Sequence, residues 1–93
     1  MTSDSVTRNL EIVNEKGLHA RASAKFVECV EDYDATAEVS RDGMSASGDS
    51  IMGLLMLAAS KGTVIEVTTR GPDAPRLAEA LERLVADRFG EKM

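Results

Sequence analysis

Four short segments of the chain alternate apolar and polar side chains, and this alternation restricts the possible folds more than any other feature. The segments cover residues 6–13, 35–40, 44–47 and 63–70. A two-residue period is typical of strands that bury one face and leave the other in water. Asp42-Gly43, between the second and third segments, is a strong hairpin signal. The pattern therefore predicts an antiparallel sheet with one solvated face.

Three other segments have the character of helices, with good helix formers and apolar residues at helical spacing. We expect them near residues 19–31, 51–60 and 73–90, the last one capped by Asp73 and closed by Gly90. The resulting order is βαββαβα. It predicts one α+β domain over residues 1–93, an open-faced β-sandwich in which three helices cover one face of a four-stranded antiparallel sheet.

Composition excludes several classes of function. The formal net charge of −5 argues against a nucleic-acid partner, because such affinity comes largely from basic patches. One His and one Cys cannot supply the usual ligands of a metal site, so we expect no metal and no cofactor. The first residues lack a basic region followed by an apolar one, and the apolar run 51–59 is too short to cross a bilayer. A cytoplasmic protein without membrane contact is the expectation.

The stretch that follows Gly17 holds the residues best suited to chemistry. His19 is the only histidine of the chain, and Arg21 stands two positions after it. Both fall at the predicted start of a helix, where backbone N–H groups lack partners and the helix dipole is positive. Such a place favours phosphate, and an imidazole there can act as the nucleophile that carries it. The ordinary alternative is that His19 is a surface residue or a helix cap.

The second predicted helix is apolar on nearly all sides between residues 51 and 59. Asp49 or Ser50 should cap it, and Lys61-Gly62 should end it. A domain of this size has no layer to cover the far side of such a helix, so part of it should face solvent. Exposed apolar patches tend to mark interaction sites, and methionine adapts to varied surfaces. A docking surface is favoured over a covered helix or a homodimer interface.

Two motifs and the order of elements together carry a family resemblance. The motifs are Gly17-Leu18-His19-Ala20-Arg21 and Ser50-Ile51-Met52-Gly53. At this separation within a βαββαβα order, the chain resembles HPr, the histidine-containing phosphocarrier family of the bacterial phosphoenolpyruvate-dependent phosphotransferase system. The resemblance runs from about residue 6 to residue 90. It implies that His19 is phosphorylated on Nδ1, that Arg21 stabilises the phosphate, and that Ser50 matches a serine phosphorylated for regulation in some members.

The resemblance also implies partners. Phosphorylated enzyme I would be the donor and an EIIA-type protein the acceptor, with a serine kinase/phosphorylase acting on Ser50 where that regulation exists. The docking surface would consist of Ala20, Ala24, Ile51, Met52 and Leu55. The chain would then be a phosphocarrier within a phosphotransferase relay rather than an independent enzyme.

Three positions depart from the familiar sugar-transport members. Ala22 replaces a proline, while Glu28 and Glu31 stand where those members carry lysines. Because charge complementarity selects partners, the two glutamates favour partners of different charge. The relay would serve either sugar uptake or nitrogen-type regulation, and the acidic residues point to the nitrogen-type branch. A protein-binding module of the same fold, controlled by serine phosphorylation, is the alternative. Retention of both His19 and Arg21 argues against it. The sequence contains neither paired carboxylates nor a phosphate-binding glycine loop, so it does not indicate an independent enzyme.

Overall fold

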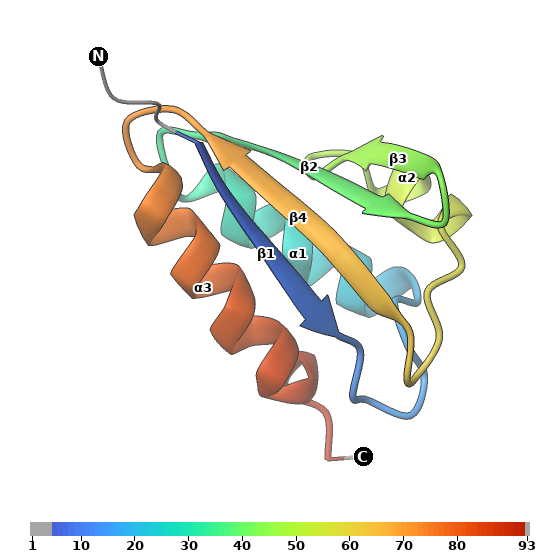
Figure 1. The fold of residues 1–93 in the computed structure, drawn as a ribbon. Helices are drawn as coiled ribbons and strands as arrows, with labels where there is room; N and C mark the ends of the chain where they lie inside the picture. Colours follow the sequence, from blue (N-terminus) through green and yellow to red (C-terminus); the bar gives the residue numbers. More distant parts are fainter. Residues whose placement is uncertain (1–4, 93) are drawn as a thin grey trace.

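The computed structural model describes residues 5–92, and its centre is an antiparallel sheet. The strands are β1 (Ser5–Glu11), β2 (Thr36–Arg41), β3 (Met44–Ser47) and β4 (Val64–Arg70), in the spatial order β1-β4-β2-β3 (Figure 1). The last strand of the chain thus lies between the first two. It pairs Ile65 with Leu10 and Val67 with Val39. The predicted antiparallel sheet is confirmed.

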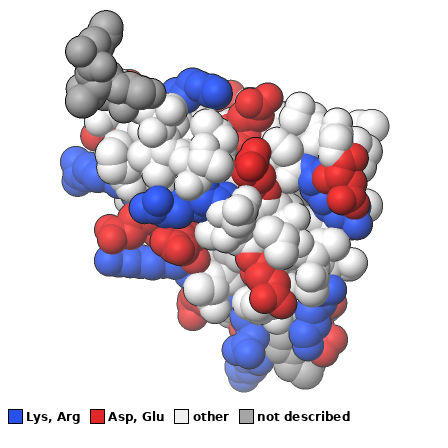
Figure 2. Space-filling model, viewed as in Figure 1, with Lys and Arg blue, Asp and Glu red and all other residues white. Residues whose placement is uncertain are grey.

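The two faces of the sheet differ as the alternation predicted. Along β4, Ile65, Val67 and Thr69 are buried, while the residues between them are exposed or half-buried. Ile65 and Val67 join the hydrophobic core beneath the sheet. On the outer face, Lys and Arg side chains lie interspersed with Asp and Glu rather than forming a patch of one sign (Figure 2). This face has no basic stripe of the kind that nucleic acids require.

The helices α1 (Ala20–Glu31), α2 (Ile51–Met56) and α3 (Ala74–Ala86) cover the other face (Figure 1). Helix α1 packs between α2 and α3, and α3 lies against β1 and β4. Each helix contributes completely buried side chains to one core, among them Phe26, Leu54 and Leu81. The predicted open-faced α+β fold of order βαββαβα is confirmed.

Helix α2 is shorter than the sequence predicted. It ends at Met56 instead of reaching Ser60, and Ala58 has the left-handed φ of 51°. The expected stop, Lys61-Gly62, belongs to the turn before β4, where the Gly62 N–H donates to the Ile12 carbonyl at 2.7 Å. The early end lets both Leu57 and Ala59 reach the core, with 2% and 3% of their surfaces exposed. Tertiary packing therefore overrides the local signal.

The last helix also ends earlier than predicted. Helix α3 stops at Ala86, and a short 3-10 turn follows at Arg88–Gly90, where Phe89 has a φ of 54°. Asp73 occupies the predicted N-cap position without making the capping bond, because its carboxylate accepts a hydrogen bond from the Asp34 N–H instead. The turn buries Phe89, which is 1% exposed, and directs the following residues toward the start of α1.

Candidate functional site

His19 is the N-cap residue of α1. Its backbone is extended, and its Nδ1 accepts a hydrogen bond from the Arg21 N–H at 3.3 Å. Its carbonyl begins the helix by accepting from the Ser23 N–H at 2.8 Å. The imidazole therefore stands at a helix N-terminus, as the sequence predicted, with Nδ1 turned toward the positive end of the dipole.

The loop before His19 is held by close backbone contacts. Gly17 has a φ of +66°, and a Cβ at this position would lie 2.5 Å from the Ala59 carbonyl oxygen. The next residue, Leu18, is buried and donates its N–H to that same oxygen at 2.9 Å. The glycine thus permits a tight junction between the loop and the segment after α2, which fixes where His19 begins the helix.

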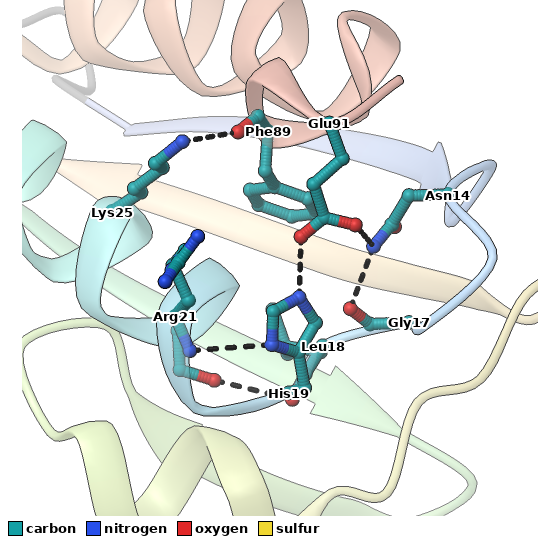
Figure 3. Close-up of polar contacts among 9 residues, drawn as sticks. Asn14, Gly17, Leu18, His19, Arg21, Lys25, Phe89 and Glu91 are labelled. Atoms are coloured by element: carbon teal, nitrogen blue, oxygen red, sulfur yellow. Dashed lines mark hydrogen bonds and ion pairs between the residues drawn. The ribbon is translucent and has the colours of Figure 1, made fainter. Parts of the chain in front are cut away.

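The second imidazole nitrogen meets a carboxylate from the far end of the chain. The Oε2 atom of Glu91 forms a hydrogen bond with Nε2 of His19, and its Oε1 accepts from Asn14 Nδ2 at 3.0 Å (Figure 3). The same Nδ2 donates to the Gly17 carbonyl at 2.8 Å. Asn14 is completely buried. One amide therefore ties the glycine turn and the glutamate together.

Two further contacts anchor the C-terminal segment. Phe89 inserts its ring into the core, and Lys25 of α1 donates from Nζ to the Phe89 carbonyl at 2.6 Å (Figure 3). The sequence interpretation assigned no role to Glu91 or Asn14. An apolar aromatic residue in the otherwise polar segment that follows α3 was the one available signal that this segment returns to the core.

The Glu91 carboxylate is ionised and accepts hydrogen bonds from its neighbours. Burial by itself would raise its pKa, but hydrogen bonds from Asn14 and His19, together with the charge of the protonated His19 ring and that of Lys16, lower the pKa below the ordinary glutamate value. At neutral pH the group is therefore ionised and accepts hydrogen bonds without donating any.

The imidazole opens into a cleft of about 460 Å³. Its walls include three cationic side chains, and its full lining is Glu15, Lys16, His19, Ala20, Arg21, Glu91 and Lys92. The Arg21 side chain rises beside the imidazole ring (Figure 3). It is exposed and pairs with no acidic group of residues 5–92. An exposed planar guanidinium suits the oxygens of a tetrahedral oxyanion.

Ser50 is the N-cap of α2, which resolves the choice that the sequence left open. Its Oγ accepts a hydrogen bond from the Gly53 N–H at 3.0 Å. Asp49 is engaged elsewhere, since its carboxylate accepts from the Ser47 hydroxyl at 2.5 Å. Ser50 is half-buried at the edge of the exposed apolar residues.

The apolar helix α2 divides into an inner and an outer side. Leu54 is completely buried, whereas Ile51 and Met52 are 40% and 69% exposed. Met56, at 75% exposed, extends the outer side. Leu55 is half-buried, as is Ala24 of α1, while Ala20 is exposed. Of the predicted docking residues, Ala20 directly follows His19, and Leu55 lines a shallow pocket together with His19.

Metal-binding clusters and membrane-spanning helices are both absent from residues 5–92. No group of three or more His, Cys, Asp and Glu side chains is arranged to hold a metal ion there. No helix in that part of the chain has the length and apolarity needed to cross a membrane.

Comparisons with known proteins identify the family of this chain. The model of a family described as "PTS HPr component phosphorylation site" matches residues 6–87. The phosphocarrier protein HPr of Neisseria meningitidis is 45% identical over 84 residues, covering 90% of this chain and 94% of that protein. HPr of Cupriavidus necator is 43% identical with the same coverage.

A solved structure shows the same fold. The crystal structure of HPr-C-His from Thermoanaerobacter tengcongensis superposes with a TM-score of 0.90 at 33% identity, covering 95% of this chain and 99% of that one. The family model and the relatives span nearly the whole chain, including both motifs. The chain belongs to the HPr family, the phosphocarrier proteins of the phosphotransferase system.

Proposed function

We propose that this protein carries a phosphoryl group on Nδ1 of His19, takes it from phosphorylated enzyme I and passes it to an EIIA-type protein. The observation that carries the proposal is the position of His19 as the N-cap of α1, with Nδ1 facing the Arg21 N–H in an open cleft. A helix N-terminus stabilises a bound phosphoryl group without burying it.

The transfer is a displacement at phosphorus. The Nδ1 lone pair of His19 forms the new N–P bond as the bond from phosphorus to the donor's nitrogen breaks and returns its electron pair to the donor. Before transfer, the Arg21 N–H donates a hydrogen bond to Nδ1 at 3.3 Å. After transfer, this N–H is available to a phosphoryl oxygen. The Arg21 guanidinium adds a charged hydrogen bond to the same group. Modest stabilisation in an open site lets the acceptor remove the phosphoryl group by the reverse displacement.

The partners would dock on the surface formed by Ala20, Ala24, Ile51, Met52 and Leu55. Two observations support this surface: Ile51 and Met52 are exposed on α2, and Leu55 lines a shallow pocket together with His19. Apolar patches of this kind tend to be interaction sites.

The exposed charges of α1 bear on which branch of the system the protein serves. Glu28 and Glu31 are both exposed. We place the protein in the nitrogen-type branch, where these acidic residues would select partners whose docking faces differ in charge from those of the sugar-transport partners. Phosphorylation of Ser50 by a serine kinase would set a negative charge directly beside Ile51 and Met52. This charge would lose its water when a partner covers the two side chains, and it would repel an acidic docking face, so phosphorylation would reduce docking.

The test is incubation with purified enzyme I and labelled phosphoenolpyruvate, followed by mapping of the labelled residue. We expect acid-labile phosphate on His19 of the wild-type protein and none on His19→Ala. Because the chain has one histidine, acid-labile phosphate on His19→Ala would overturn the proposal. Binding of partners without any phosphate transfer would instead fit a protein-binding module.

A further inference from the structure

We propose that Glu91 is a positioning residue for His19: its carboxylate keeps the imidazole proton on Nε2, so that Nδ1 presents a lone pair to phosphorus. The proposal deepens the function proposed above and rests on it for the chemistry at Nδ1. The assignment of the proton itself can be tested without any partner protein.

The hydrogen bonds of both ring nitrogens require the same tautomer. Nδ1 accepts from the Arg21 N–H at 3.3 Å, so in neutral imidazole it must carry the lone pair. Nε2 faces Oε2 of Glu91, which is ionised and can only accept. The opposite tautomer would set two N–H groups against each other at Nδ1 and a lone pair against a carboxylate at Nε2. The contacts therefore select the tautomer that phosphorylation of Nδ1 needs.

The carboxylate is held in place by contacts on both sides of it. Its Oε1 receives a hydrogen bond from the completely buried Asn14, which also binds the Gly17 carbonyl of the loop before His19. Two residues before the glutamate, Phe89 is buried and its carbonyl accepts from Lys25. The glutamate and imidazole side chains are themselves only 18% and 28% exposed. Several contacts, and not the one to His19 alone, therefore hold Glu91 in place relative to the start of α1.

The same contact serves the phosphorylated state. When Nδ1 bonds to phosphorus, the imidazole already has a proton on Nε2, so the ring acquires positive charge and no proton has to leave. The Glu91 carboxylate then faces an Nε2–H of a cationic ring, which strengthens their hydrogen bond. When the acceptor takes the phosphoryl group, the electron pair of the N–P bond returns to Nδ1 and the starting tautomer is restored.

Glu91→Gln is the informative variant because its shape is unchanged. Asn14 donates to the Oε1 position, so the carbonyl of the glutamine is best placed there, and its NH₂ group then faces Nε2 of His19. That arrangement disfavours the proton on Nε2. Glu15→Gln is the matched control: Glu15 lines the same cleft and loses the same charge, but its carboxylate pairs with Lys61 at 3.2 Å instead of with the imidazole.

The first measurement is NMR of the protein labelled with 15N-histidine, recorded at increasing pH until the nitrogen shifts of the ring no longer change. The wild-type protein and Glu15→Gln should show a slowly exchanging Nε2–H and an unprotonated Nδ1. Glu91→Gln should lose the slowly exchanging Nε2–H signal while its backbone amide spectrum stays folded. A wild-type proton on Nδ1, or identical imidazole spectra for wild type and Glu91→Gln, would overturn the proposal.

The second measurement is the rate of phosphoryl transfer from enzyme I. We expect Glu91→Gln to be roughly tenfold slower or more, since carboxylate partners of working histidines have effects of this order. Glu79→Gln, which removes the same charge from an exposed position of α3 outside the cleft, should stay close to wild type. A wild-type rate for Glu91→Gln would also refute the positioning role. Failure of the wild-type protein to accept phosphate would refute the proposed function instead, and the NMR result distinguishes the two failures.

Discussion

Substitution of Gly17 by alanine should damage this protein more than the same change at any open glycine turn. Gly17 has a φ of +66°, and its added Cβ would lie 2.5 Å from the Ala59 carbonyl oxygen and 2.9 Å from Ser60 Cα. Both atoms belong to the backbone, so no side chain can rotate away to make room. The loop before His19 and the segment after α2 would have to separate.

The expected loss can be built from three contributions. A left-handed φ costs an L-residue about 1–2 kcal/mol, and forcing a methyl group into a packed contact costs about 1–3 kcal/mol. Separation of the two segments also weakens the hydrogen bond from the Leu18 N–H to Ala59, which is 2.9 Å long and worth about 1 kcal/mol. We therefore expect Gly17→Ala to lower the free energy of unfolding by roughly 3–6 kcal/mol, a large share of the usual 5–15 kcal/mol.

Gly43→Ala isolates the backbone contribution. Gly43 has a comparable φ of +81°, but a Cβ added to it in the β2–β3 hairpin would meet no atom within 4 Å. This control should lose only the cost of the left-handed φ, about 1–2 kcal/mol. Urea unfolding of both variants measures the difference directly. Equal losses for Gly17→Ala and Gly43→Ala would show that the tight junction before His19 does not exist.

Four other outcomes are expected. Arg21→Ala should slow phosphoryl transfer roughly 10- to 100-fold, because a charged hydrogen bond is worth about 1.5–3 kcal/mol, and should move the unfolding free energy by no more than about 0.5 kcal/mol; transfer kinetics and urea unfolding check both. Met52→Asp should weaken enzyme I binding roughly tenfold in calorimetry without unfolding the protein, as its side chain is 69% exposed. Ser50→Asp should weaken the same binding at low salt and less at high salt, which calorimetry at two ionic strengths would detect. The pKa of Glu91 is lower in the folded protein than in the unfolded chain. Its contribution to stability should therefore be complete above the ordinary glutamate pKa of about 4.3 and be lost as the pH falls further. The unfolding free energies of wild type and Glu91→Gln, measured in urea, should converge in acid.

The fold was largely predictable because its determinants are local. Alternation within short segments specifies strands with one buried face, and the Asp42-Gly43 turn pairs β2 with β3. The ends of the helices were less predictable. Lys61-Gly62 is a good helix stop, yet α2 ends at Met56 because Leu57 and Ala59 are drawn into the core. Local signals do not report how much apolar surface the rest of the domain offers.

One part of the candidate site could be predicted from the sequence and another part could not. His19 and Arg21 lie two residues apart at a helix start, so their juxtaposition could be predicted from the sequence. The contact between His19 and Glu91 joins residues 72 positions apart, and no periodic pattern indicates it. Asn14 looks like a residue of a polar loop, but it is completely buried because its amide links Gly17 to Glu91. Such a network depends on where the C-terminal segment comes to rest, which only the packed structure determines.

The position of the phosphorus on the imidazole is the most direct test of the proposed chemistry. Protein labelled with 15N-histidine would be phosphorylated by enzyme I and phosphoenolpyruvate, and phosphorus–nitrogen couplings would then be recorded by NMR. Because His19 is the only histidine, any coupling belongs to its ring. We predict coupling to Nδ1, with the proton retained on Nε2. Coupling to Nε2, or phosphate bound to no imidazole nitrogen, would contradict the proposed role of His19.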